Sequence, residues 1–214
     1  MSGEPIAVYL VRHGQSQANV AGVFANRVHG YPLTAQGRAQ AEHLAVRLGA
    51  ELAGRPLASL RTSPILRARQ TAAILAVRWG TPVHPPDAAL TEFDVGVYEG
   101  TTDPEHWEAF AQLVTDWLIH DQWDHRIAGG ESYRDIAARF QPFLHRLLAS
   151  STPGDVHVLV THGGLLRCMV PLIAGNINGQ YATDHPLDNA AWIRLVTTPD
   201  RITCHTWGNH HFAP

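Results

Sequence analysis

The sequence predicts an α/β fold, a three-layer sandwich in which helices flank a mainly parallel central sheet. Segments 6–12 (IAVYLVR) and 156–164 (VHVLVTHGG) open with continuous apolar runs, as expected of strands buried on both faces. Stretches with apolar residues at helical spacing alternate with such strands. The 214 residues are 45% hydrophobic, which is enough for one large core, so we expect a single domain over 1–214.

After the first strand, the chain predicts a helix, a strand and a second helix. Thr34 is the expected N-cap of a helix over about 35–52. A short strand follows and ends at Ser63. We expect Ser63 to cap the next helix, with Pro64 at its first position and Gly80 at its end.

The second half of the chain begins with a tryptophan-rich helical segment that does not repeat the βα pattern. We expect this segment, about 100–129, to form an insertion or lid. A helix over about 131–149 follows, with Pro142 as a site of kinking or strain. The helix after segment 156–164 and two strands over 192–207, paired as a hairpin, complete the predicted order.

Composition excludes several classes of partner. The net charge is −3 and no run of Lys or Arg occurs, so we expect neither a nucleic-acid nor a membrane partner. Cys168 and Cys204 lie in apolar stretches and are expected to be reduced core thiols. With no basic leader or long apolar segment, we expect a cytoplasmic protein. The 14 histidines lack paired metal-ligand spacing, so no metal or other cofactor is expected, while a homodimer is left open.

The two apolar strands both end on a histidine and a glycine, in LVRHG and VLVTHGG. Ligands of α/β sheets bind beyond the carboxyl ends of the strands, so we expect His13 and His162 to meet there. Gly14 and Gly163 allow the backbone to approach a ligand, and the helix after Gly163 offers N–H groups to an anion. The sequence therefore predicts an anionic ligand.

Two arginines strengthen this prediction. Arg12 places a planar set of donors beside His13, and Arg67 lies on the first turn of its helix, where it can reach the same strand ends. Arg69 is the expected surface charge of that helix. Two guanidinium groups, two imidazoles and backbone amides are more typical of a phosphate pocket than of a carboxylate site.

Six blocks of the sequence resemble, in order and spacing, the histidine phosphatase superfamily, which includes the phosphoglycerate mutases. The blocks are LVRHGQSQAN, SPILRARQTA, LTEFDVGVYEG, GGES, VTHGG and PLDNA. They span nearly the whole chain. The resemblance implies a phosphoglycerate mutase-like fold and a covalent phosphohistidine mechanism without a metal.

The resemblance also implies roles for individual residues. His13 matches the nucleophile that accepts the phosphoryl group. Arg12, Arg67 and His162 match the pocket that holds the phosphoryl oxygens, and Gly163 belongs to the same phosphate-binding set. Phosphoryl transfer requires mainly in-line positioning and cationic donors around these oxygens, which such residues supply.

Two further matches have structural alternatives. Glu92 matches the residue that donates a proton to the leaving oxygen and later deprotonates the attacking water. The alternative is a solvated loop carboxylate, which is the common state of such a residue, and Asp94 lies nearby in the sequence. Glu99 is expected to be structural. Asn19 matches a contact to the phosphate, with a side-chain cap as its alternative.

The chain departs from the family in the segment NRVHGYPLT, which is short and lacks the acid that relatives often carry there. Substrate choice therefore cannot be transferred from relatives. Arg27, His29 and Tyr31 are candidate substrate contacts, or they only shape the loop. The tryptophans of the next insertion, at 107, 117 and 123, are expected to be core residues rather than a platform for ligand.

We expect a metal-independent phosphomonoesterase that hydrolyses a small organic phosphate. A bisphosphoglycerate-dependent phosphoglycerate mutase is the alternative, which would benefit from a long, basic insertion. Segment 100–129 is acidic instead, with Arg126 as its single Lys or Arg. A non-catalytic phospho-ligand binding module is a distant third reading, since it would not need both His13 and Glu92. A zinc hydrolase is disfavoured by the histidine spacing.

Overall fold

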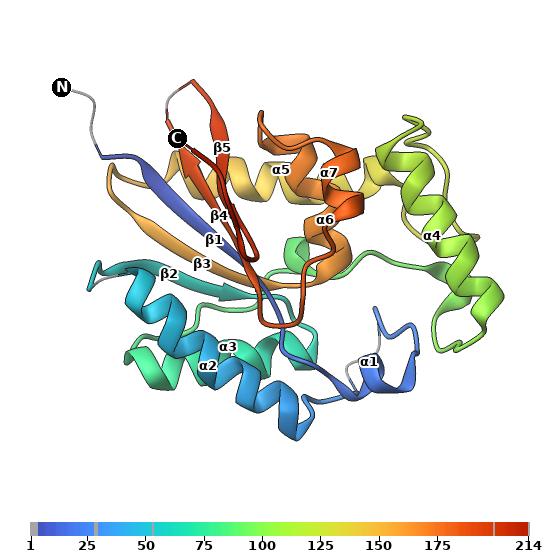
Figure 1. Ribbon diagram of the computed structural model, residues 1–214, viewed down its shortest axis with the longest axis horizontal. Coiled ribbons are helices and arrows are strands. Elements are labelled where there is room, and N and C mark those ends of the chain that lie inside the picture. The colour runs from blue at the N-terminus through green and yellow to red at the C-terminus, as the bar shows by residue number, and fades with distance from the viewer. Residues whose placement is uncertain (1–3, 28–29, 53, 199, 214) are drawn as a thin grey trace.

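The computed structural model describes residues 4–27, 30–52, 54–198 and 200–213. A six-stranded sheet forms its centre, in the order β2-β3-β1-β4-β5-β6 (Figure 1). The strands are β1 (Ile6–Arg12), β2 (Leu57–Thr62), β3 (Val156–Thr161), β4 (Trp192–Thr197), β5 (Ile202–Trp207) and β6 (His210–His211). The α/β class and the closing β4–β5 hairpin are therefore confirmed.

The sheet is mixed in strand direction. Strands β2, β3 and β1 are parallel to one another, whereas β4, β5 and β6 join through antiparallel pairings. Short turns connect β4 to β5 and β5 to β6, and such turns cannot join parallel strands. The antiparallel pairing of β4 with β1 joins distant segments of the chain. The predicted parallel arrangement thus describes the half of the sheet that carries the two histidine motifs.

The register of β1 and β3 brings those motifs together. Arg12 pairs with Thr161 at the end of the parallel ladder, so His13 and His162 are the next residues of adjacent strands. The His13 N–H donates to the Thr161 carbonyl over 3.0 Å, which continues the pairing by one residue.

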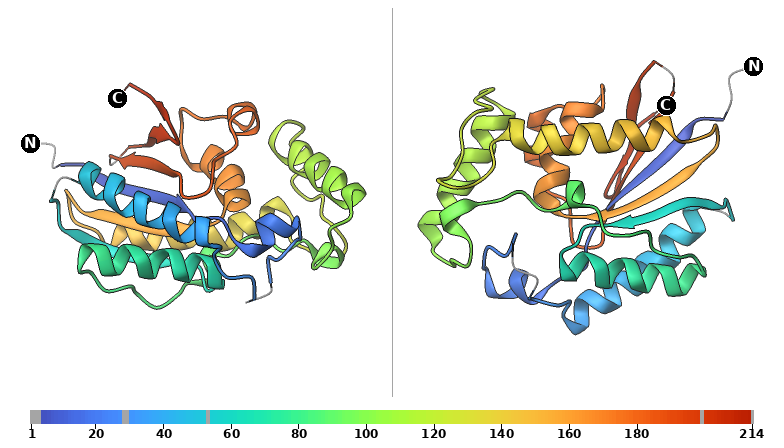
Figure 2. Two further views of the ribbon diagram at one scale, coloured as in Figure 1. Left: turned by 60° about the horizontal axis from the view of Figure 1, so that its bottom comes forward. Right: turned by 180° about the vertical axis from the view of Figure 1, so that it is seen from behind.

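Helices cover both faces of the sheet (Figures 1 and 2). They are α1 (Gln17–Ala21), α2 (Ala35–Leu52), α3 (Leu66–Trp79), α4 (Pro104–Leu118), α5 (Tyr133–Ala149), α6 (Gly163–Ile173) and α7 (Gly179–Asp184), with 3-10 turns η1 (Ala88–Leu90) and η2 (Gly96–Tyr98). Tyr9 and Val11 of β1 pack into the core beneath α2 and α3. Val8 and Leu10 face the larger core beneath α5 and α6. This alternation is the period of a strand buried on both faces.

Helix α3 begins later than the sequence predicts. Its first residue is Leu66 and its N-cap is Ile65, which makes no side-chain cap. Ser63 was expected to cap this helix. Its hydroxyl instead accepts from the Ile65 N–H over 3.2 Å and bonds to the His162 ring over 2.7 Å. The prediction is wrong because α3 starts three residues after Ser63, and the Ser63 hydroxyl bonds instead to His162, the residue that follows β3.

The segment before α5 contains one long helix, α4, which lies at the end of the molecule opposite the two chain termini (Figure 1). Asp103 caps α4 and Pro104 occupies its first position. Pro142 lies inside α5, which runs through it. Cys168 and Cys204 are buried free thiols. None of the helices in the described part of the chain combines the length and apolarity needed to cross a membrane.

Candidate active site

A pocket opens at the carboxyl ends of β1 and β3. It has a volume of about 230 Å³, and six of the seven predicted site residues line it: Arg12, His13, Asn19, Arg67, Glu92 and Gly163. The seventh, His162, lies behind the pocket surface and meets His13 edge to face, with ring centroids 5.1 Å apart. The expected meeting of the two histidines is therefore present.

The His13 ring is held in one tautomer. Its Nδ1 lies 2.7 Å from the Gly14 carbonyl, which can only accept, so Nδ1 carries the proton. Its Nε2 accepts a hydrogen bond from Arg67 Nε over 2.9 Å and therefore presents its lone pair toward Arg67. Burial lowers the pKa of His13 well below its usual value, and the charge of Arg67 lowers it further. The ring is thus a neutral imidazole whose unprotonated nitrogen is Nε2.

His162 is buried against His13 and is anchored by Ser63 through Nε2. Its Nδ1 is buried and has no hydrogen-bond partner among the described residues. Burial, followed by the charge of Arg67, also lowers the pKa of His162 well below its usual value. A second neutral ring therefore supports the first, with one ring nitrogen left for a ligand.

The two predicted arginines reach the pocket from different elements. Arg67, buried on the first turn of α3, donates through Nη1 to the Ala25 carbonyl over 2.7 Å. Arg12, at the end of β1, donates to the Leu187 carbonyl, and its buried Nε has no partner among the described residues. Arg69 is exposed, as the sequence predicts. The backbone contacts fix both guanidinium groups beside His13.

Glu92 lies at the N-terminus of α6. Its carboxylate accepts from the Gly164 N–H over 2.8 Å and from the Phe93 N–H over 3.1 Å. Burial raises the pKa of Glu92, although the Gly164 hydrogen bond and the charge of Arg67 oppose the rise. A side chain at Gly164 would place its Cβ 2.7 Å from Glu92 Oε1, which explains the glycine. One of the N–H groups at the start of α6, which were expected to face an anionic ligand, thus binds this carboxylate.

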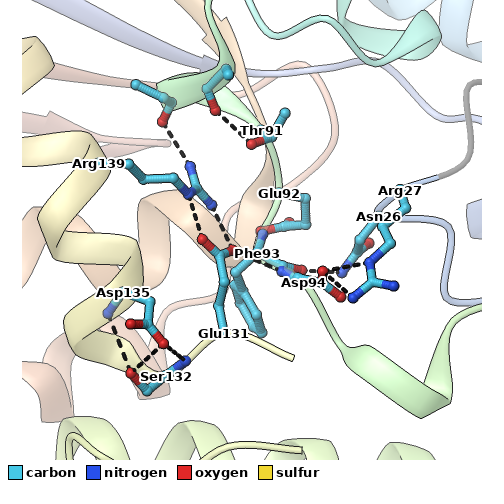
Figure 3. A network of polar contacts seen from close by, with 12 residues as sticks. Asn26, Arg27, Thr91, Glu92, Phe93, Asp94, Glu131, Ser132, Asp135 and Arg139 are labelled. Carbon is cyan, nitrogen blue, oxygen red and sulfur yellow. Dashed lines mark hydrogen bonds and ion pairs between the residues drawn. The ribbon is translucent and has the colours of Figure 1, made fainter. Parts of the chain in front are cut away.

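A polar network fixes the loop that carries Glu92 (Figure 3). Arg139 of α5 donates to both oxygens of Glu131, over 2.8 and 3.1 Å, and to the Ala89 carbonyl over 2.8 Å. Glu131 in turn accepts from the Asp94 N–H over 2.9 Å. Sequence reasoning missed Arg139, and the available signal was the GGES block that contains Glu131.

Arg27 and Tyr31, two of the candidate substrate contacts of the short loop, are not among the residues that line the pocket. Arg27 forms an ion pair with Asp94, and its backbone N–H donates to Glu99 over 3.0 Å. Tyr31 packs against a small apolar cluster at a positive φ of 60°. Both residues therefore shape the loop, and Glu99 has its expected structural role. His29 lies outside the described residues.

Asn19 and Trp107 combine structural and pocket positions. Asn19 lines the pocket, while its Oδ1 accepts from the Ser16 N–H over 3.0 Å in the cap of α1. Trp117 is a core residue with 1% exposure, as predicted. Trp107 is 38% exposed and lines the pocket, so its assignment to the core is wrong. The helical period gave no signal that the start of α4 faces a ligand site.

The charged groups of the pocket do not form a ligand shell for a metal. No group of three or more His, Cys, Asp and Glu residues suited to a metal ion occurs within the described ranges. The groups that converge around His13 are Arg12, Arg67, two neutral imidazoles and one carboxyl of raised pKa, and Arg167 of α6 also lines the pocket. This arrangement can bind a tetrahedral anion, offer it a nucleophilic nitrogen and supply a proton.

Comparison with known proteins agrees with this arrangement. The model of the histidine phosphatase superfamily (branch 1) matches residues 8–210. A probable phosphoglycerate mutase GpmB of Klebsiella pneumoniae subsp. pneumoniae is 35% identical over 179 residues, which cover 79% of this chain and 75% of the relative.

Solved structures extend the likeness over nearly the whole chain. "Mycobacterial hydrolase 1" superposes with a TM-score of 0.81 at 27% identity, covering 96% of this chain and 99% of that one. A mycobacterial glucosyl-3-phosphoglycerate phosphatase, solved with VO3, gives a TM-score of 0.77 at 27% identity, covering 95% and 99%. With the His13 and His162 motifs at the parallel strand ends, the chain belongs to branch 1 of the histidine phosphatase superfamily.

Proposed function

We propose that this protein is a metal-independent phosphomonoesterase that hydrolyses a small organic phosphate through a phosphohistidine at His13. The observation that carries the proposal is the state of the His13 ring, with Nδ1 bonded to Gly14 and Nε2 facing Arg67. A neutral imidazole with this lone pair is what attack on phosphorus requires. The solved phosphatase of similar structure supports hydrolysis.

When the phosphate binds, Arg67 Nε donates to a phosphoryl oxygen instead of to His13 Nε2, which frees the lone pair of that nitrogen. In the first step, His13 Nε2 attacks phosphorus and the bond from phosphorus to the ester oxygen breaks. Arg12 and Arg67 hold the phosphoryl oxygens, as does the unpartnered His162 Nδ1. The Glu92 carboxyl gives its proton to the departing alkoxide. The raised pKa of Glu92 makes the protonated form available for this transfer.

In the second step, water attacks the phosphohistidine. The Glu92 carboxylate accepts a proton from this water as its oxygen bonds to phosphorus. The phosphorus–Nε2 bond then breaks, inorganic phosphate leaves, and both His13 and Glu92 return to their starting protonation states. One carboxyl group thus serves both steps.

A phosphoglycerate mutase is the second candidate, because curated relatives bear the name probable phosphoglycerate mutase. A mutase needs its product retained by further cationic contacts, while α4 and its flanks contribute Asp103, Glu105 and Asp116. A binding module is less well supported, since binding alone does not need a proton donor of raised pKa beside a neutral imidazole.

The test measures phosphate release from p-nitrophenyl phosphate and from a panel of sugar and glycerate phosphates, with EDTA present. The wild-type protein should release phosphate, and His13→Ala should lose this activity by at least about 10³-fold. Quenching the reaction should trap an acid-labile phosphoenzyme in the wild type only. EDTA-sensitive release would overturn metal independence. Isomerisation of phosphoglycerate that depends on a bisphosphate primer would favour the mutase. Binding of phosphate without either reaction would favour the binding module.

Our proposals on cellular context are a small phosphate ester as partner, no nucleic-acid or membrane partner, and a location in the cytoplasm. The buried free thiols of Cys168 and Cys204 support a reducing compartment. We also propose that residues 1–214 form one domain, with segment 100–129 as an insertion that covers the site. A homodimer is our proposal for the oligomeric state.

A further inference from the structure

One side of the active-site pocket is an apolar wall. It consists of Val23, Phe24, Trp107, Phe110, Pro186 and Leu187. These residues come from three segments: the loop after α1, the helix α4, and the loop between α7 and β4. The catalytic groups contributed by β1, α3 and α6 lie on the same pocket, so a ligand bound at His13 would extend along this wall.

The aromatic part of the wall is preformed. Trp107 stacks on Phe24 with ring centroids 3.8 Å apart and 19° between planes, and its Nε1 donates to the Gly22 carbonyl over 2.9 Å. Phe110 stacks on Phe93 at 5.4 Å and 7°. Phe93 directly follows Glu92, so the wall and the proton donor share one packed unit. A rigid aromatic surface binds an apolar group at little entropic cost.

The charged groups of the pocket come from segments other than those that form the wall. Apart from the histidine, the pocket's charged described residues are Arg12 and Arg67 beside His13, the proton donor Glu92, and Arg167 on α6. The wall segments add none. A volume of about 230 Å³ lies below the roughly 300–1,000 Å³ typical of drug-sized sites, so it fits a phosphate and one group of ring size.

We propose that the natural substrates are small phosphate esters of alcohols that carry an apolar, ring-sized group, and that this group packs on Trp107 and Phe110. This inference rests on the proposed phosphomonoesterase. It assigns Trp107, which is 38% exposed at the pocket, as a specificity-determining residue. Esters whose alcohol part is polar or anionic would leave the aromatic surface in water and gain less from binding.

The test compares kcat/KM for benzyl phosphate, glycerol 1-phosphate and 3-phosphoglycerate, three alkyl esters that each leave as an alkoxide. Wild type should prefer benzyl phosphate over glycerol 1-phosphate by at least about tenfold. Trp107→Ala should bring this ratio close to one, and Trp107→Phe should retain most of it. Val77→Ser, at an exposed position of α3 outside the pocket lining, is the control and should keep the wild-type ratio.

The outcomes separate this inference from the function on which it rests. If wild type hydrolyses none of the three esters nor p-nitrophenyl phosphate, the phosphomonoesterase itself is wrong. If it hydrolyses them without preference, or prefers 3-phosphoglycerate, the hydrolase stands and the apolar substrate class is overturned. A benzyl preference that Trp107→Ala leaves intact would overturn the assignment of Trp107.

Discussion

At the scale of single residues, burial shifts the pKa values of the proposed nucleophile His13 and the proposed acid Glu92 toward their neutral forms. It lowers the pKa of His13 and raises the pKa of Glu92. The two shifts favour the unprotonated imidazole and the protonated carboxyl. This pairing suits a nucleophile and an acid that act in the same step.

Glu92→Gln should separate the two roles. Glutamine keeps an oxygen for the Gly164 N–H and removes the transferable proton. For alkyl phosphates we expect kcat/KM to fall by about 10²–10⁴, with a much smaller effect on the first step for p-nitrophenyl phosphate, whose phenolate leaves unprotonated. Because wild type loses its acid as pH rises through the raised pKa of Glu92, the alkaline fall of its pH profile should disappear in the variant. An equal loss for both substrates would contradict this role.

At the scale of elements, the N-terminus of α2 packs closely against the loop that follows β1. Thr34 caps α2 through its hydroxyl, which accepts from the Gly37 N–H over 2.9 Å, and the Thr34 N–H donates to the Gln15 carbonyl over 3.0 Å. A Cβ at Gly37 would lie 1.9 Å from the same Gln15 carbonyl oxygen. A glycine within a helix is normally unfavourable, and here it permits the contact that positions the loop bearing His13.

Gly37→Ala should therefore destabilise the protein, against the usual trend for a helix. We expect the free energy of unfolding to fall by about 1–3 kcal/mol, the cost of overpacking, together with a lower kcat from displacement of His13. Urea titration provides the measurement. Gly175→Ala is the matched control, because no atom lies within 4 Å of its added Cβ, and its change should stay within about 0.5 kcal/mol. If Gly37→Ala had a higher free energy of unfolding than the wild type, the loop at Gln15 would have to move aside at little cost.

The elements also show what the sequence could predict. Apolar runs that end in histidine and glycine gave β1, β3 and the meeting of His13 with His162, because those signals are local and parallel strand ends coincide. The antiparallel pairing of β4 with β1, the Ser63 bond to His162 and the exposure of Trp107 were not predictable. Each depends on which distant segment packs alongside, which local periodicity does not encode.

At the scale of the whole molecule, three buried histidines make stability depend on pH. Besides His13 and His162, His157 of β3 is buried between Ser59 and Ser151, whose hydroxyls lie 2.8 Å from its two ring nitrogens. Burial is the main cause that lowers each pKa below the unfolded value of about 6.5. Below about pH 6.5 the unfolded chain then binds more protons than the folded protein. The contribution of each histidine to the free energy of unfolding is therefore fully present above this pH and is lost as the pH falls, by up to about 1.4 kcal/mol per pH unit.

Replacing His157 isolates one of these contributions away from the active site. His157→Gln offers an amide donor and acceptor to the two serines and cannot take up a proton. Between pH 6.5 and 5, the slope of the unfolding free energy against pH should become shallower by up to about 1.4 kcal/mol per pH unit, measured by urea titration at each pH. Glu92 opposes the histidines, since its raised pKa favours folding at lower pH, but it contributes equally to both proteins. His43→Gln, at an exposed position of α2, is the control. If both variants kept the wild-type slope, His157 would not be held neutral by burial, and acid sensitivity would come from other groups.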